Sequence, residues 1–275
     1  MASTSSPRTP LLVLGCGQRC GSTLVQRLLC SHPRVMIWGE HDGQLRPILE
    51  AVEQLAFWVE HQGAVGRKEL TESGYQGFIA NMTPPSRHVV DAGRAFVETL
   101  FAKPALQQGK SIWGFKEVRY GLTEIRQLHM LFPQLRVVVI VRDPRDVLCS
   151  LDDWERHPGW MRHHTEDALR NWLRAAGSFV DGAIVPELRE LVFTVRYEEL
   201  IAEPRRWTAA IAQHCALDMA GFDLAVFGVR VRNAFKQGPT AAPLRAWREL
   251  PADMRALLDN NEIVSVAASY GYHLS

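Results

Sequence analysis

The sequence lacks a long apolar run, a surplus of one charge sign and any C-x-x-C pair. No stretch approaches the roughly 18 consecutive apolar residues that a membrane-spanning helix needs. Lysine and arginine number 31 and aspartate and glutamate 30, so the net charge is +1, whereas nucleic-acid binding calls for a clear basic surplus. We therefore expect neither a membrane nor a nucleic acid as a partner.

Cysteine and histidine form no cluster typical of a disulfide framework or a metal site. The odd cysteine total indicates reduced thiols in a reducing compartment. His163 and His164 have no second ligand cluster at a familiar spacing, so we expect no metal. Residues 1–10 are a short polar tail without the apolar core of a secretory leader, and we expect a cytoplasmic protein. The cysteines are Cys16, Cys20, Cys30, Cys149 and Cys215.

The rest of the chain is long enough for one sizeable core and short for two, so residues 11–275 are predicted to form a single domain. Short apolar runs alternate with helical patterns, an order typical of an α/β fold in which helices flank a central parallel sheet. In such folds the ligand lies at the carboxyl ends of the strands. The predicted strands are 11–15, 34–38, 112–115, 135–141 and 191–196.

The first predicted strand leads into a glycine-rich turn with polar groups at the start of a helix. Gly17 and Gly21 shape the turn, and Arg19 lies between them. Ser22 and Thr23 open the helix. Backbone N–H groups exposed at a helix start, beside hydroxyls and a guanidinium, favour a phosphate or a sulfate. The turn therefore predicts an anion site but does not name its ligand.

Two familiar nucleotide-binding patterns fit this turn less well. A Walker A loop needs G-x-x-x-x-G-K-[ST], but Ser22 follows Gly21 directly and the lysine is missing. A dinucleotide fingerprint needs two residues between its last two glycines, and three separate Gly17 from Gly21, although Glu40 lies where a ribose-binding acid would sit. A P-loop kinase or phosphotransferase, a nicotinamide oxidoreductase and a non-enzymatic nucleotide-binding module remain alternatives.

The fourth predicted strand leads into a second anion-binding pattern. Arg142 follows the strand, and Pro144 suits the first turn of a helix. On that helix Ser150 falls about two turns after Arg142, so both can face one ligand, and arginine can bind a phosphate bidentately. The competing interpretation is a surface cluster of salt bridges, because Arg-Asp-Pro-Arg-Asp contains both charge signs.

Together the two patterns resemble the donor-binding motifs of the sulfotransferases that use 3′-phosphoadenosine-5′-phosphosulfate (PAPS). The family's 5′-phosphosulfate loop, R-S-G-[ST]-T-L, is similar to Arg19-Cys20-Gly21-Ser22-Thr23-Leu24, with Cys20 in place of serine. Its 3′-phosphate motif resembles the segment from Arg142 to Ser150. The resemblance, greatest to tyrosylprotein sulfotransferases and related bacterial enzymes, implies a P-loop-like three-layer fold and PAPS as sulfuryl donor. It implies these donor-binding residues: Arg19, Cys20, Gly21, Ser22, Thr23, Leu24, Arg142 and Ser150.

Two further segments contain the catalytic groups that the resemblance implies. Lys116, in Trp-Gly-Phe-Lys-Glu, resembles the lysine that reaches the transferring group in that subgroup, so Lys116 and Arg19 would stabilise the leaving group. Glu40 and His41 follow the second predicted strand. A glutamate at this place is the proposed base of the subgroup, which favours Glu40. His41 is the alternative, because histidine has a suitable unperturbed pKa.

The resemblance continues toward the C-terminus. Tyr197-Glu-Glu-Leu followed by Pro204 resembles the family's Y-E-[DE]-L-x-x-x-P segment, in which the tyrosine lies near the nucleotide. The segment after Phe235 resembles the family's closing loop, and Tyr270-Gly-Tyr272 resembles its last helix. This resemblance adds four donor-binding predictions: Tyr197, Lys236, Gln237 and Gly238.

Residues 44–109 form a region with helical patterns at 48–59 and 87–100. In enzymes of this kind the inserts around the sheet form the acceptor pocket, and we expect the same of this helical insert. The acceptor would be a hydroxyl of a small molecule, a sugar or a peptide, and the motifs do not select among these or give an oligomeric state. The aromatic candidates for the pocket are Trp58, Tyr75, Phe78 and Phe96.

Overall fold

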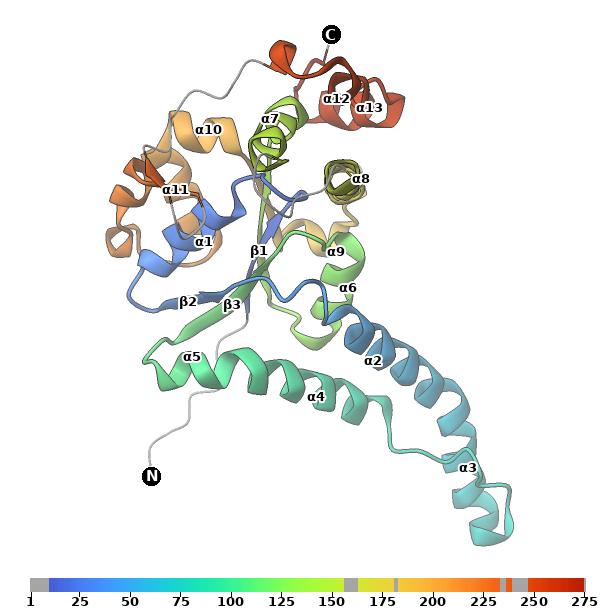
Figure 1. The fold of residues 1–275 in the computed structure, drawn as a ribbon. Coiled ribbons are helices and arrows are strands. Elements are labelled where there is room, and N and C mark those ends of the chain that lie inside the picture. The colour runs from blue at the N-terminus through green and yellow to red at the C-terminus, as the bar shows by residue number, and fades with distance from the viewer. Residues whose placement is uncertain (1–9, 156–162, 181–182, 233–235, 239–246, 275) are drawn as a thin grey trace.

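A five-stranded parallel sheet lies at the centre of the molecule (Figure 1). The computed structural model describes residues 10–155, 163–180, 183–232, 236–238 and 247–274, and of residues 153–155, 163–164, 230–232 and 236–238 the backbone alone. The sheet order is β2-β3-β1-β4-β5, which makes β1 the central strand. Its strands are β1 Leu11–Gly15, β2 Val35–Trp38, β3 Ile112–Glu117, β4 Arg136–Val141 and β5 Val192–Arg196. A separate antiparallel pair consists of β6 Arg230–Arg232 and β7 Lys236–Gly238.

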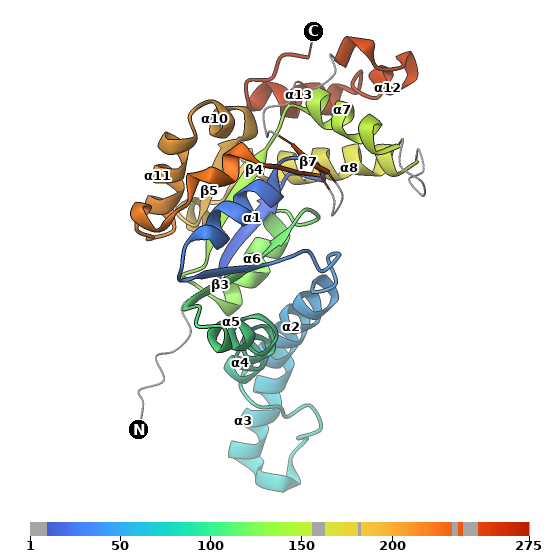
Figure 2. The ribbon, with the colours of Figure 1, turned by 60° about the vertical axis from the view of Figure 1, so that its left-hand side comes forward.

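Helices connect successive strands and occupy most of the rest of the described chain (Figure 2). The first half contains α1 Ser22–Ser31, α2 Arg46–Trp58, α3 Ala64–Ser73, α4 Ser86–Val97, α5 Lys103–Gln107 and α6 Leu122–Leu131. The second half contains α7 Pro144–Glu155, α8 His163–Ser178, α9 Pro186–Arg189, α10 Tyr197–Ala202, α11 Pro204–His214, α12 Ala252–Ala256 and α13 Asn261–Ser269. Val59–Gly63 and Glu98–Ala102 are π-helical turns. Short 3-10 turns are Gly74–Gln76, Met219–Gly221, Leu224–Gly228 and Trp247–Glu249.

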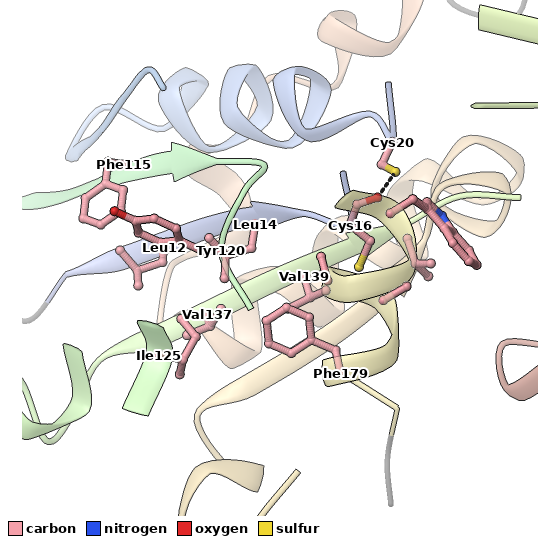
Figure 3. Packing of buried hydrophobic residues seen from close by; sticks show 14 of the residues in the cluster. Leu12, Leu14, Cys16, Cys20, Phe115, Tyr120, Ile125, Val137, Val139 and Phe179 are labelled. Atoms are coloured by element: carbon pink, nitrogen blue, oxygen red, sulfur yellow. Dashed lines mark hydrogen bonds between the residues drawn. The ribbon is translucent and has the colours of Figure 1, made fainter. Parts of the chain in front are cut away.

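Two apolar clusters, one on each face of the sheet, form the core. Alternate side chains of a strand point to opposite faces, so Leu11 and Val13 pack with α1, α10 and α11. Leu12 and Leu14 pack on the other face with α6, α8 and the C-terminal helices α12 and α13. Figure 3 shows part of this second cluster, with Phe179 at the end of α8 beside β4. The three-layer α/β fold predicted from the sequence is therefore confirmed.

The predicted strands lie where the sequence placed them, with small differences at their ends. The β-branched run of β4 is buried after its first residue, as expected for an inner strand covered on both faces. The strand β3 is longer than predicted and ends at Glu117, so Lys116 lies within the strand rather than at its end. At the start of helix α6, the Glu124 carboxylate accepts the backbone N–H of Gly121 at 2.7 Å.

The helical insert forms an arm, residues 46–107, that extends away from the sheet (Figures 1 and 2). Helix α2, the π turn and α3 follow one another without a break from Arg46 to Ser73. Helix α4 packs back against α2 and α6. At about 1.5 Å per residue, the run from Arg46 to Ser73 is on the order of 40 Å long. The end formed by α3 and residues 74–85 therefore lies far from the sheet.

Candidate active site

The turn between β1 and α1 has a backbone that exposes N–H groups. Gly17, Arg19 and Gly21 have φ angles of 80°, 64° and 95°, and alternating left-handed residues create a concavity lined by N–H groups that suits an anion. Gly21 is the N-cap of α1, and no side chain caps the helix there. The first N–H groups of α1 are therefore available to a ligand.

Two of these glycines are required by close packing as well as by conformation. A Cβ atom on Gly21 would lie 2.4 Å from the ring of Tyr197, the first residue of α10. A Cβ on Gly17 would lie 2.9 Å from the backbone nitrogen of Trp172 in α8. Real contacts of this kind are essentially never so short, so both positions require glycine. The turn therefore packs between α10 and α8.

The two predicted anion motifs meet at this turn. The Arg19 Nε donates to the Ser150 hydroxyl at 2.9 Å, across 131 residues of sequence. The Arg142 Nη1 donates to the carbonyl of Arg19 at 3.1 Å, and its guanidinium lies over the Tyr197 ring at 4.4 Å from the centroid. Arg142 is 6% exposed, and its Nε has no hydrogen-bond partner among the described residues. The structure therefore brings Arg19, Arg142, Ser150 and Tyr197 together.

Hydrogen bonds from side chains of α8, α10 and the C-terminal segment fix the loop after β4. The Trp172 indole donates to the carbonyl of Arg142 at 3.0 Å. The Glu198 carboxylate accepts the backbone N–H of Asp143 at 3.0 Å and the Tyr272 hydroxyl at 2.7 Å. Sequence reasoning missed these roles, although Glu198 belongs to the Tyr-Glu-Glu-Leu segment and Tyr272 to the C-terminal Gly-Tyr. The position of Arg142 thus depends on α8, α10 and the C-terminal segment.

The remaining predicted residues of the turn differ in their exposure. Cys20 is buried, and its thiol donates to the carbonyl of Cys16 at 2.6 Å (Figure 3). Burial raises the pKa of the Cys20 thiol to about 12, so the thiol stays protonated and contributes to the core. Leu24 also packs in the core, Ser22 is buried and Thr23 is exposed. Of this group, only the backbone N–H groups and the two hydroxyls are suited to an anion.

Strand alternation places Lys116 on the same face of the sheet as Arg142. Lys116 lies opposite Val13 in the parallel pairing of β3 with β1. It has the same parity as Ile112, which packs on the α1 side, so its side chain points to that side. Arg142 continues the alternation of Val138 and also points there. The cation of Lys116 therefore lies on the face where α1 begins.

Glu40 pairs directly with Lys116. The Lys116 ammonium donates to the Glu40 carboxylate in a short ion pair. The Lys116 side chain is 6% exposed, whereas the Glu40 side chain is 35% exposed. The other oxygen of Glu40 lies 3.3 Å from Nη1 of Arg119. A buried cation thus meets a carboxylate that is open to solvent and to a substrate.

His41 points elsewhere. Its imidazole packs among the rings of Phe101, Phe115 and Tyr120, with centroid distances of 5.9, 5.1 and 5.6 Å. Burial lowers the pKa of His41 below its usual value of 6.5. Neither ring nitrogen has a hydrogen-bond partner among the described residues, and Nδ1 lies 3.6 Å from the Glu117 carboxylate. Of the two candidate bases, only Glu40 contacts the predicted catalytic lysine.

Glu117 binds the loop that contains Glu40. The Glu117 carboxylate is completely buried and accepts the backbone N–H groups of Val118 and Gly43, each at 2.8 Å. Arg119 adds an ion pair at 3.2 Å. These hydrogen bonds hold the pKa of Glu117 below its usual value against the opposing effect of burial. No sequence motif indicated this role for Glu117, although the residue directly follows Lys116 at a strand end.

The remaining predicted residues are those of the closing segment and the four aromatic candidates for the acceptor pocket. Lys236, Gln237 and Gly238 form β7, of which the structure describes the backbone alone. Tyr75 and Phe78 are 81% and 71% exposed at the far end of the arm, which is on the order of 40 Å along the helix from Arg46. Trp58 and Phe96 are also exposed, at 41% and 44%.

The described residues contain no group of three or more metal-ligating side chains. None of the described helices has the length and apolar character needed to cross a membrane. The arrangement that is present consists of an uncapped helix start, two arginines and the hydroxyls of Ser22, Thr23 and Ser150, beside a buried lysine paired with a partly exposed carboxylate. Such a set can bind a strong anion and can assist transfer of a charged group to a nucleophile.

A model of the sulfotransferase family matches residues 10–221, more than half of the chain. This chain belongs to the sulfotransferase family. The matched range contains the turn, Glu40, Lys116, Arg142 and Tyr197. No curated protein matched the sequence.

Solved structures of sulfotransferases have the same fold. The sulfotransferase domain of the Synechococcus PCC 7002 olefin synthase matches with a TM-score of 0.55 at 17% identity, covering 98% of this chain and 97% of that one. The sulfotransferase domain from the curacin biosynthetic pathway matches with a TM-score of 0.52 at 14% identity, covering 98% and 100%. At these identities the likeness concerns the fold.

Proposed function

We propose that this member of the sulfotransferase family transfers the sulfuryl group of PAPS to a hydroxyl acceptor. The observation that carries the proposal is the ion pair of Lys116 with Glu40 on the face of the sheet where Arg19 and Arg142 meet. A module that only binds a nucleotide needs the arginines but has no use for a buried lysine paired with an accessible carboxylate. A kinase of the P-loop type would need the Walker lysine, which the turn lacks.

The donor would be held by the residues around the turn. The uncapped start of α1 offers N–H groups to the 5′-phosphosulfate. Arg142 and Ser150 offer a guanidinium and a hydroxyl to the 3′-phosphate, and Arg19 lies between them. The unpartnered Nε of Arg142 and its stacking on Tyr197 support this assignment. An arginine fixed in this way loses little freedom when its ligand binds.

The reaction needs a group that stabilises negative charge and a group that accepts a proton. In sulfuryl transfer, as in phosphoryl transfer, charge builds on the leaving phosphate at the transition state. The bond from sulfur to the leaving phosphate oxygen breaks while a bond from sulfur to the acceptor oxygen forms. Lys116 would stabilise the leaving charge, and Glu40 would accept the proton of the acceptor hydroxyl. The products are the sulfate ester and adenosine 3′,5′-bisphosphate.

The donor assignment is tested by calorimetric titration. The wild-type protein is titrated with adenosine 3′,5′-bisphosphate, ADP, ATP and NAD, and Arg142→Ala serves as the site variant. The expected result is tight binding of the bisphosphate alone, which the variant loses. Preferential binding of ATP or NAD would overturn the proposal in favour of a kinase or an oxidoreductase.

The base assignment is tested by two neighbouring variants. With PAPS and a panel of hydroxyl acceptors, Glu40→Gln is expected to lose transfer while it still binds the bisphosphate. His41→Phe is expected to keep transfer, because His41 packs among aromatic rings. The reverse pattern would assign the base to His41.

A further inference from the structure

Large apolar side chains are exposed along the arm and at few other places in the described part of the chain. Outside the arm, the exposed large apolar residues that the structure describes are three valines, Val185, Val229 and Val264. The arm contains far more, including five aromatic residues. Its exposed large apolar residues, named here the arm patch, are Leu55, Phe57, Trp58, Val65, Leu70, Tyr75, Phe78, Met82, Phe96, Leu100 and Leu106.

The active site of the same chain does not account for the far end of the arm patch. Glu40 lies just before the start of α2, whereas Tyr75 and Phe78 follow the end of α3. The unbroken helical run between them is on the order of 40 Å long. A side chain spans only a small part of that distance, so the far end of the patch serves another purpose.

The arm is too thin to bury these side chains itself. Its inner contact is made by small residues: a Cβ on Gly63 would lie 2.0 Å from the hydroxyl of Thr83, and one on Gly66 would lie 2.6 Å from the backbone of Met82. Ala56 and Val59, which precede these glycines on the same helical run and are buried, are also small or medium in size. Two layers of chain packed so closely leave their large apolar residues on the outer surfaces.

The exposed area is of the size that a stable interface needs. Phe57, Trp58, Tyr75, Phe78 and Phe96 are 67%, 41%, 81%, 71% and 44% exposed, which at ~200 Å² for a whole aromatic side chain leaves roughly 600 Å² open. The aliphatic members of the patch add to this area. The total exposed area is of the same order as the ~800 Å² that each partner contributes to a standard interface.

The charges of the arm favour a partner with the same surface. Between Arg46 and Gln107 the arm has seven acidic and six basic residues. Several are paired on their own helix, as in Lys68–Glu72 and Arg94–Asp91. An arm with nearly balanced charge repels its own copy only weakly, whereas an anionic membrane surface would favour a basic surplus. Two such helical layers can pack into a bundle around a two-fold axis, in which the same patch serves both subunits.

We propose that the arm patch is a homodimerisation surface, on which the arms of two copies of this chain pack against each other. The proposal does not depend on the proposed function, because none of the catalytic or donor-binding residues belongs to the patch. The partner is a second copy of this chain rather than a lipid or another protein.

The test measures the molar mass of the full chain in solution. Light scattering after size-exclusion chromatography and sedimentation equilibrium are run over a wide range of concentrations. The wild-type protein is expected to be a dimer, and the double variant Phe57→Glu/Phe78→Glu a monomer. Val185→Glu and Val264→Glu, which place the same charge on exposed valines outside the arm, are expected to remain dimers. Circular dichroism and bisphosphate titration verify that each variant is folded.

Three results would overturn the proposal. The first is a wild-type protein that is monomeric at every concentration. The second is a dimer that the arm variant retains or that a control variant loses, because the interface then lies elsewhere. The third is a monomer that binds neutral phosphatidylcholine vesicles through the patch, which would assign the patch to lipid.

Discussion

The carboxyl edge of the sheet and the helical arm differ in which side chains they bury. At the edge, Lys116, Glu117 and Arg142 are buried. Each is bonded to a neighbouring group: Lys116 to Glu40, Glu117 to Arg119, and Arg142 to the carbonyl of Arg19. In the arm, aromatic groups such as Tyr75 and Phe78 are exposed. Both are departures from the ordinary distribution, in which charges face water and large apolar groups are inside. Each departure costs free energy unless other groups offset that cost.

The two regions differ in what offsets this free-energy cost. A buried charge is tolerated only when other groups bind it, and Glu117 has two backbone N–H groups and Arg119. The compensation is therefore internal, and the edge is organised before any ligand arrives. The arm has no internal compensation within its described residues, so its partner has to come from outside. Variants that pair a change at the edge of the sheet with a matched change in the arm test this contrast.

Removing Lys116 is expected to have the largest effect. Lys116→Ala removes a cation that is 6% exposed and paired with Glu40, and the loss of one group that stabilises the transition state lowers kcat on the order of 10³-fold. Bisphosphate affinity is expected to change little, because Arg19, Arg142 and Ser150 remain. Lys68→Ala removes an arm lysine that is 74% exposed and should leave kcat unchanged. Equal turnover in the two variants would remove Lys116 from the mechanism.

A methyl group on Gly21 is expected to have the next largest effect. In Gly21→Ala the new Cβ meets the Tyr197 ring at 2.4 Å on a residue with φ 95°. Strain of about 1–3 kcal/mol would weaken bisphosphate binding roughly tenfold to a hundredfold. Gly74 in the arm also has a positive φ, 60°, but open space around its Cβ. Gly74→Ala should therefore lower stability slightly without affecting bisphosphate affinity, and equal affinity losses would show that the Tyr197 contact is unimportant.

Neutralising Glu117 is expected to affect turnover more than binding. Glu117→Gln keeps the size of the side chain but weakens the charge-assisted bonds to Gly43 and Val118. Such bonds are each worth about 1.5–3 kcal/mol, so we expect kcat to fall roughly tenfold as the loop carrying Glu40 loosens. Bisphosphate affinity should be retained, and Glu117→Asp should recover part of kcat.

Glu72→Gln, on an exposed arm residue in an ion pair with Lys68, is the matched control for this variant. A positioning role requires that kcat falls while bisphosphate affinity is retained. A parallel loss of kcat, bisphosphate affinity and thermal stability in Glu117→Gln would instead show that Glu117 only maintains the fold.

The sequence was sufficient for those features that depend on neighbouring residues. Arg142 follows a run of β-branched residues, and a polar residue at the end of a buried strand must lie at the carboxyl edge of the sheet. Glu117 acts by binding the backbone of Gly43 in the loop after β2. The sequence does not predict this contact, because tertiary packing brings that loop to the end of β3. The helical patterns of the arm likewise predict helices with apolar residues along one face. They do not indicate whether that face packs on the sheet or is exposed to solvent. Tyr75 and Phe78 are exposed to solvent.

The smallest expected effect is a loss of stability in mild acid. Burial lowers the pKa of His41 and His214 below their usual value of 6.5. The folded protein therefore binds fewer protons than the unfolded chain, so the contribution of these residues is complete above pH 6.5 and declines as the pH falls below it. The urea midpoint is expected to decrease from pH 7.5 to pH 5.5, and less so in His41→Phe. The exposed arm residue His61, which contacts Phe57 at its surface, provides the matched variant His61→Phe. An acid-induced decrease that His61→Phe reduces as much as His41→Phe would show that the burial of His41 is not its cause.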